Sequence, residues 1–330
     1  VDGGNVFTID TAAEVRAFSA STGRQLWRYA IDGDGRGRRL AFGGGVSAGD
    51  GKLFATSGLG RVVALEQATG RRLWEADLQV PLRGAPAVAG GQIFVISQDN
   101  QLFALSASDG STQWDMAATV ENASLFGAAT PAVSQGTIVA GFSAGELIAL
   151  RVENGRVVWQ DALARTGIAT SVGILSDIDA SPAIDRGRVF AVGKGGRMAA
   201  LELNTGQRVW EVNMAGAETP VPSGDWVYTV TDTAQVVCLS RATGKVRWMT
   251  QLRAFGNEKK KSKPISWSGP VLADGRLIVV SSRGQMVTLS AAEGTVQREV
   301  KLSGDAMLSP AVANGVLYVL TEDGHLSAWR

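Results

Sequence analysis

Residues 61–74 read RVVALEQATGRRLW: an alternating apolar segment, a Thr-Gly turn, and a tryptophan four residues after the glycine. Similar stretches occur at 101–114, 197–210 and 235–248. β-Branched and aromatic residues that alternate between turn residues predict strands rather than helices. Because the unit recurs about every 40 residues, it indicates a repeat fold whose units bury their apolar faces by stacking on their neighbours.

The tryptophan is the most regular feature of the repeat. Six of the 9 tryptophans follow a glycine by four residues: Trp27, Trp74, Trp114, Trp159, Trp210 and Trp248. In a seventh unit, Arg298 takes the place of the tryptophan after Gly294. A position shared by so many units predicts a structural role for these tryptophans in the core.

A complete unit contains four expected strands. A short segment of the Pro-Ala-Val type comes first, and two longer strands and a fourth strand ending at the tryptophan follow. Four strands in about 41 residues are typical of a β-propeller blade. The second and third strands occur eight times, so the sequence predicts an all-β fold: one eight-bladed β-propeller of four-stranded antiparallel blades. The expected blades are approximately 3–28, 45–76, 84–116, 128–160, 180–212, 218–250, 268–300 and 308–330.

The two ends of the chain differ in this scheme. The first expected blade shows no first strand, and the last expected blade shows no fourth strand. Those two strands would be consecutive in a segment that precedes Val1. We therefore expect the full-length protein to contain such a segment and to close the ring with its N-terminal strand.

The composition excludes several kinds of site. Lys and Arg (32) nearly balance Asp and Glu (31), which is not the basic footprint of a nucleic-acid-binding protein. A single Cys and a single His leave no disulfide framework and no multi-Cys zinc site. Cys238 stands where Ala64 and Ala104 stand in other units, which predicts a small core residue. His325 has no nucleophile beside it in a recognisable motif, so we expect no catalytic residue, no metal and no cofactor.

Long insertions follow the fourth strands, at 29–45, 116–128, 160–180 and 250–268. In a four-stranded meander, these linkers lie on the same face as the turns between the second and third strands. Binding residues concentrate in loops that a rigid frame holds in place. We therefore expect this loop-rich face to carry the function.

Three charged motifs in these linkers allow more than one interpretation. The Asp-Gly-Asp-Gly stretch at 32–35 lacks the further bidentate Glu of a calcium loop, which favours a charged loop. The run Lys259–Lys263 suits an acidic partner, anionic lipid headgroups or simply a solvated loop. Asp177 and Asp179 suit a metal, an acid/base pair or a basic partner patch, although no His or Cys lies nearby to complete a metal site.

The units ALEQATGRRLW, ALELNTGQRVW and CLSRATGKVRW resemble the repeat of quinoprotein-like (pyrroloquinoline quinone-like) propellers over nearly the whole chain. Residues 175–183, LSDIDASPA, also resemble the Leu-Ser-Asp-Val-Asp-x-x-Pro-Val stretch of the BamB family. That resemblance implies a non-catalytic lipoprotein adaptor of the β-barrel assembly machinery, at the periplasmic face of the outer membrane of a Gram-negative bacterium. It implies as partners the periplasmic (POTRA) domains of the barrel-forming subunit and unfolded outer-membrane proteins, and an N-terminal lipid anchor as the membrane attachment.

The resemblance also implies which residues bind the partner. Leu125, Asp177 and Asp179 match the family's partner-binding positions, and Leu175 and Phe126 lie beside them. Phe126 stands where the family has Arg, and Ala123 stands where it has Leu. Without this Arg, the interface loses a positive charge and the five N–H donors of a guanidinium group. We therefore expect the interface to be more apolar or rebuilt.

Two other functions stay open at this stage. One is a quinone-dependent dehydrogenase of the same fold, although such enzymes are typically longer and carry adjacent cysteines, which Cys238 alone cannot provide. The other is a periplasmic propeller scaffold with a different partner.

Overall fold

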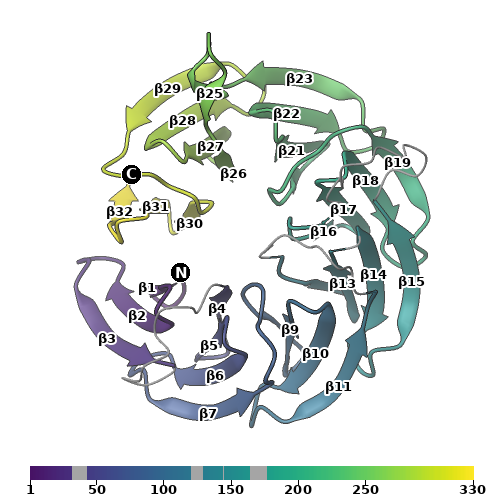
Figure 1. Cartoon of the computed structure of the whole chain (residues 1–330), viewed down its shortest axis with the longest axis vertical. Coiled ribbons are helices and arrows are strands. Elements are labelled where there is room, and N and C mark those ends of the chain that lie inside the picture. The colour runs from purple at the N-terminus through teal and green to yellow at the C-terminus, as the bar shows by residue number, and fades with distance from the viewer. Residues whose placement is uncertain (32–42, 120–128, 144, 164–176) are drawn as a thin grey trace.

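The structure, a computed structural model, describes residues 1–31, 43–119, 129–143, 145–163 and 177–330. Eight antiparallel sheets stand around a central axis as the blades of a propeller (Figure 1). Both chain ends lie where the last blade meets the first (Figure 1). The predicted all-β, eight-bladed fold is confirmed. Within the described residues, no helix has the length and apolar character needed to cross a membrane.

The strands take four places from the axis outward, and most blades run through them in chain order. The innermost strands are β4 (Gly44–Gly49), β8 (Ala87–Ala89), β12 (Ala132–Ser134), β16 (Ala183–Asp185), β20 (Val221–Ser223), β26 (Trp267–Ala273) and β30 (Ala311–Ala313). The second strands are β1 (Asn5–Ile9), β5 (Lys52–Ser57), β9 (Gln92–Ile96), β13 (Thr137–Gly141), β17 (Arg188–Gly193), β21 (Trp226–Val230), β27 (Arg276–Ser281) and β31 (Val316–Leu320). The third strands are β2 (Glu14–Ser19), β6 (Arg61–Glu66), β10 (Gln101–Ser106), β14 (Glu146–Arg151), β18 (Arg197–Glu202), β22 (Gln235–Ser240), β28 (Gln285–Ser290) and β32 (Leu326–Trp329). The outermost strands are β3 (Gln25–Ala30), β7 (Arg72–Asp77), β11 (Thr112–Ala117), β15 (Val157–Ala162), β19 (Arg208–Val212), β23 (Val246–Gln251) and β29 (Val296–Lys301).

The first and last sheets have three strands each in this sequence, β1-β2-β3 and β30-β31-β32. The first sheet lacks an innermost strand and the last sheet lacks an outermost strand, which are the two strands missing from the repeat pattern. A preceding segment that supplies them stays a prediction.

The hydrophobic core lies between blades rather than at one centre. One cluster of buried side chains joins Phe54 and Val62 of blade 2 to Ile93 and Leu105 of blade 3. Among the described residues, each pair of consecutive blades from 1 to 8 encloses a cluster of this kind. Each blade is therefore stabilised chiefly by its two neighbours, as in other repeat proteins.

The repeated tryptophans make contacts between blades. The indole of Trp159 in blade 4 covers Gly206 of blade 5, where an added Cβ would lie 2.6 Å from the Trp159 Cγ. The Trp159 Nε1 donates a hydrogen bond of 2.7 Å to the carbonyl oxygen of Leu203. The same pair of contacts repeats for Trp27, Trp74, Trp114, Trp210 and Trp248.

Within blades 1, 2, 3, 5 and 6, the tryptophan packs on an aromatic residue of the second strand and stands opposite a small residue of the third. In blade 5 the rings of Phe190 and Trp210 lie 6.0 Å apart, and Ala200 stands opposite Trp210. Cys238 occupies the place of Ala200 in blade 6, opposite Trp248, and is fully buried. The prediction of a small core residue at Cys238 is confirmed.

The linker at 250–268 has secondary structure of its own. It contains a hairpin of β24 (Phe255–Asn257) and β25 (Ser262–Pro264). The Glu258 carboxylate accepts hydrogen bonds from the backbone N–H groups of Ala254 and Phe255, at 3.0 and 3.1 Å, which ties the turn to the first strand. A side chain that satisfies its own turn in this way is not visible in strand periodicity.

Replacing Gly206 by Ala tests the contact between blades. We expect Gly206→Ala to lower the free energy of unfolding by about 1–2 kcal/mol for the left-handed backbone and by about a further 1–3 kcal/mol for the overlap with Trp159. Urea denaturation measures the change.

Gly187→Ala is the matched control. Gly187 has nearly the same φ (72° against 71°), yet an added Cβ would meet nothing within 4 Å. This variant should therefore show only the backbone cost. Equal losses for the two variants would contradict the role given to the indole.

Candidate partner-binding face

The described ends of the linkers into blades 4 and 5, residues 129–131 and 177–182, contact each other. The backbone N–H of Thr130, just before β12, donates a hydrogen bond of 2.9 Å to the Ser181 hydroxyl, just before β16. The bond joins two linkers that are 51 residues apart in the sequence.

The Asp177–Ile178–Asp179 stretch is anchored through its central residue. Ile178 is fully buried, and a Cβ added to Gly141 of blade 4 would lie 2.4 Å from the Ile178 Cγ2. The Ile178 N–H donates to the carbonyl oxygen of Phe142 at 3.2 Å, and the Lys194 N–H donates to that of Asp177 at 3.0 Å. The stretch therefore bridges the turns that follow β13 and β17.

Asp179 forms two ion pairs inside the protein. Its Oδ1 lies 3.3 Å from Arg83 Nη2, and its Oδ2 lies 2.8 Å from Lys194 Nζ. The side chains of Asp179 and Arg83 are 7% and 2% exposed, whereas that of Lys194 is 29% exposed. Because Arg83 belongs to the linker into blade 3 and Asp179 to the linker into blade 5, this pair holds two linkers in a fixed relation.

The buried surroundings of Arg83 disfavour the charged form of its guanidinium. Burial lowers the pKa of the Arg83 guanidinium, and the carboxylates of Asp179 and Asp177 oppose that shift. Asp177 itself is fully buried. The motif therefore places both carboxylates in the interior of the loop-rich face, and Lys194 is the member of the cluster that reaches the surface.

Sequence reasoning missed Arg83 and Lys194. Neither belongs to a motif, and Arg83 is 96 residues from Asp179 in the sequence. Leu125, Phe126 and Leu175, the other predicted partner-binding residues, lie outside the described residues, as does the Asp-Gly-Asp-Gly stretch at 32–35. Their roles stay predictions.

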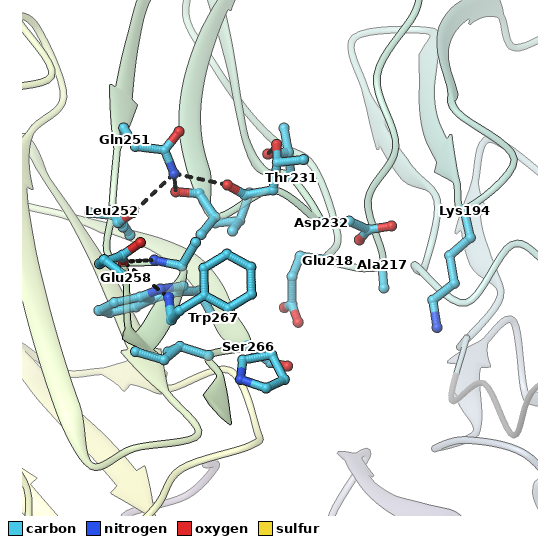
Figure 2. Close-up of a pocket in the computed structure, with 17 residues that line it drawn as sticks. Lys194, Ala217, Glu218, Thr231, Asp232, Gln251, Leu252, Glu258, Ser266 and Trp267 are labelled. Carbon is cyan, nitrogen blue, oxygen red and sulfur yellow. Dashed lines mark hydrogen bonds between the residues drawn. The ribbon is translucent and has the colours of Figure 1, made fainter. Parts of the chain in front are cut away.

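A cavity of about 860 Å³ opens between blades 5 and 6 and the β24–β25 hairpin (Figure 2). Apolar side chains, among them Phe255, Ile265 and Trp267, form the side next to the hairpin. Figure 2 shows the Glu218 and Asp232 side chains between Trp267 and Lys194. This cavity is amphipathic, with acidic groups opposite an apolar wall.

Both carboxyl groups in this cavity have shifted pKa values. Burial raises the pKa of Glu218, although the Gly269 N–H donates a hydrogen bond of 2.9 Å to its Oε2. Burial also raises the pKa of Asp232, with a smaller contribution of the same sign from Asp179 that Lys194 opposes. For both carboxyl groups, the cost of burial therefore outweighs the stabilisation of the anion by neighbouring donors and charges.

The single Cys and the single His lie apart from these sites. Cys238 is in the core of blade 6, where burial raises the pKa of its thiol to about 11. His325 is exposed in the turn before β32. Within the described part of the chain, no group of three His, Cys, Asp or Glu residues is arranged to hold a metal ion.

Asp179→Asn tests the buried ion pair. The substitution removes the main countercharge of Arg83, and we expect it to lower the free energy of unfolding by about 3 kcal/mol. The double variant Arg83→Met/Asp179→Leu should recover part of that loss, because it removes the buried guanidinium together with its main countercharge but leaves Asp177 buried without Arg83.

Glu66→Gln is the control for this test. Glu66 and Arg71 form an exposed pair with 3.5 Å between Oε1 and Nη2, which should contribute much less to stability because solvent screens it. Urea denaturation of all three variants measures the difference. A loss for Asp179→Asn no larger than that for Glu66→Gln would contradict the structural role of the pair.

Glu218→Gln tests the raised pKa of the cavity carboxyl through the pH dependence of stability. A folded-state pKa above the ordinary value of 4.5 means that stability is lost as the pH rises from that value through the folded pKa. The variant should therefore be more stable than the parent at pH 7. The difference should vanish at about pH 3, where the carboxyl group is protonated in both states.

Thermal unfolding at the two pH values measures the effect. Glu66→Gln serves as control, since Thr69 and Arg71 lower the pKa of Glu66, so this variant should not gain stability at pH 7. A constant difference between Glu218→Gln and the parent across the pH range would contradict the shift.

Comparisons with known proteins agree with this architecture. A sequence model of the family described as outer membrane protein assembly factor BamB matches residues 11–250 and 253–329. The BamB protein of Yersinia pestis is 25% identical over 332 residues, which cover 99% of this chain and 82% of the relative. That of Escherichia coli K12 is 27% identical, and the match covers 97% of this chain and 80% of the relative.

Solved structures show the same fold. BamB from Moraxella catarrhalis superposes with a TM-score of 0.86 at 21% identity, covering 99% of this chain and 94% of that structure. A europium-containing methanol dehydrogenase superposes with a TM-score of 0.75 at 13% identity, covering 99% of this chain and 81% of that structure. At such low identity the structural likeness shows the fold alone. The family match, in contrast, extends over nearly all eight blades, and this chain belongs to the BamB family of outer membrane protein assembly factors.

Proposed function

We propose that this chain is a non-catalytic adaptor in the assembly of outer-membrane β-barrel proteins. The observation that carries the proposal is the match to the BamB family over residues 11–250 and 253–329. The site of action would be the periplasmic face of the outer membrane in a Gram-negative bacterium. The partners would be the periplasmic domains of the barrel-forming subunit, together with unfolded outer-membrane proteins.

The loop-rich face would bind the partner, with the linkers into blades 4 and 5 at its centre. Leu125, Phe126 and Leu175 would supply the apolar contacts. The carboxylates of Asp177 and Asp179 are buried in the chain without its partner. Their first contribution would therefore be to hold the linker in one conformation. A preformed surface binds with a smaller loss of conformational entropy than a mobile one.

Charge would guide the approach of the partner. Lys194 is partly exposed and is held against Asp179, so a partner at this place meets a cation next to two largely buried carboxylates. Such arrangements set the orientation and the rate of docking more than they raise the affinity. A direct bond between the partner and Asp177 or Asp179 would require one of the internal pairs to exchange.

A quinone-dependent dehydrogenase is a weaker candidate for this chain. The structural likeness to methanol dehydrogenase is at 13% identity, and it concerns the fold. Among the described residues that line the 860 Å³ cavity there is no Cys and no His. The acidic and apolar lining of that cavity suits binding of another surface at least as well as chemistry.

Site-specific crosslinking tests the adaptor function. A photoreactive benzoylphenylalanine at Leu125 should form a covalent adduct with the barrel-forming subunit in cells of a Gram-negative host, identified by mass spectrometry. Asn204 is the control position, because it is exposed in the turn between β18 and β19, at the opposite face. It should give no such adduct.

Three outcomes would contradict the proposal: no adduct from Leu125, an equally strong adduct from Asn204, or an adduct from Leu125 with an unrelated periplasmic protein. The last outcome would favour a scaffold with a different partner. Charge reversal at Asp179 is a poor test of binding, because its ion pairs make the substitution a change in stability first.

A further inference from the structure

The β24–β25 hairpin is a separate structural feature on the rim of the propeller. It stands between blades 6 and 7, and β25 with its turn reaches beyond the outer strands β23 and β29 (Figure 1). Its base is held by Arg253, whose Nε and Nη2 donate hydrogen bonds to the carbonyl oxygens of Phe255 and Gly256, at 3.0 and 2.7 Å. In its turn, the Asn257 side chain accepts a hydrogen bond of 3.0 Å from the Lys260 N–H. The hairpin thus presents its side chains on an ordered backbone.

Cations dominate the exposed surface of this hairpin and its flank. Lys259, Lys260, Lys261 and Lys263 are all exposed on the hairpin. Arg253, Arg283 and Lys301 extend the group toward blade 7 and are exposed as well. The same set of residues includes the carboxylates of Glu258 and Glu299, and Glu258 accepts backbone hydrogen bonds of the hairpin. Cations therefore outnumber carboxylates on the hairpin and its flank toward blade 7.

A cavity of about 520 Å³ lies between the hairpin and blade 7. Its charged lining residues are Arg253, Lys263, Arg283, Lys301 and Glu299. The opposite side of the hairpin faces the acidic 860 Å³ cavity through Phe255, Glu258 and Pro264. The hairpin therefore separates a basic surface from an acidic one.

We propose that the hairpin and the 520 Å³ cavity form the basic hairpin site, a docking surface for the anionic phospholipid headgroups of a membrane. The lysines of the turn would lie against the headgroup layer, and the four cations of the cavity would surround a single phosphate. Each Lys or Arg close to an anionic bilayer adds several-fold to the affinity, and the effect is screened by salt. The site is distinct from the linkers into blades 4 and 5 that would bind the protein partner.

The composition of the site favours a membrane over other polyanions. A specific protein interface usually has an apolar core inside a polar rim, whereas the 520 Å³ cavity is lined chiefly by charged side chains. Binding of single-stranded nucleic acid usually needs aromatic faces for stacking, and none of the described lining residues of this cavity is aromatic. A projecting row of lysines can meet a flat anionic surface with several charges at once.

Vesicle flotation tests the proposal. The chain should float with vesicles of about 30% phosphatidylglycerol in phosphatidylcholine at about 50 mM NaCl, and not with pure phosphatidylcholine. Binding should be largely lost at about 500 mM NaCl. Lys259→Gln/Lys260→Gln/Lys261→Gln should weaken the binding by on the order of 100-fold. Arg283→Gln/Lys301→Gln should weaken it by on the order of 10-fold.

Two charge-reversal variants distinguish an effect of the basic hairpin site from an effect of the net charge of the protein. Lys259→Glu/Lys260→Glu/Lys261→Glu should abolish flotation. The matched control, Arg24→Glu/Arg156→Glu/Lys245→Glu, makes the same change in net charge at exposed positions in the turns between third and fourth strands, on the opposite face. It should bind within a few-fold of the parent. Thermal unfolding checks that each variant is folded, and the Gln variants serve if a Glu variant is not.

Several outcomes would overturn the proposal. They are no flotation of the parent at low salt, equal losses for the hairpin and control variants, and preferential capture of the chain by polyglutamate or by a single-stranded oligonucleotide in competition with the vesicles. Because these readouts do not involve the barrel-forming subunit, their failure is distinguishable from failure of the crosslinking at Leu125.

Discussion

The contact of an indole with a glycine in the next blade is the interaction on which the rest of this structure depends. It joins Trp159 to Gly206, and the same contact joins each pair of consecutive blades from blade 1 to blade 7. The glycine must have a positive φ and no side chain, and the indole N–H must reach a carbonyl oxygen. Each contact therefore sets both the distance and the register between neighbouring blades, which gives a uniform and stiff frame.

A uniform frame leaves the linkers as the place where this chain can differ from other propellers. The linkers into blades 3 and 5 are tied by Arg83 and Asp179, and Ile178 is inserted between blades 4 and 5. The buried ion pair gains little net stability, since desolvation offsets much of the attraction. Its effect is to restrict the geometry of the face, which is what an adaptor that works through a surface requires.

The β24–β25 hairpin gives the opposite case, a linker that forms its own sheet. Glu258 closes its turn and Arg253 holds its base, so its lysines are presented on ordered backbone. The hairpin also divides two cavities of opposite charge. In the sequence the same lysines were compatible with a solvated loop, because a run of like charge does not show what its neighbours in space are.

The repeat by itself determined the fold, the strand positions and the place of the tryptophans, because a blade is specified by residues close together in the chain. It also indicated which face carries the long linkers and that Cys238 is a small core residue. Only the tertiary structure decided the surroundings of Asp177 and Asp179. Their cationic neighbour Arg83 lies 96 residues from Asp179, and burial depends on the packing of several blades at once. Local spacing can identify a motif, but whether its charges face solvent or one another is set by the closure of the ring around them.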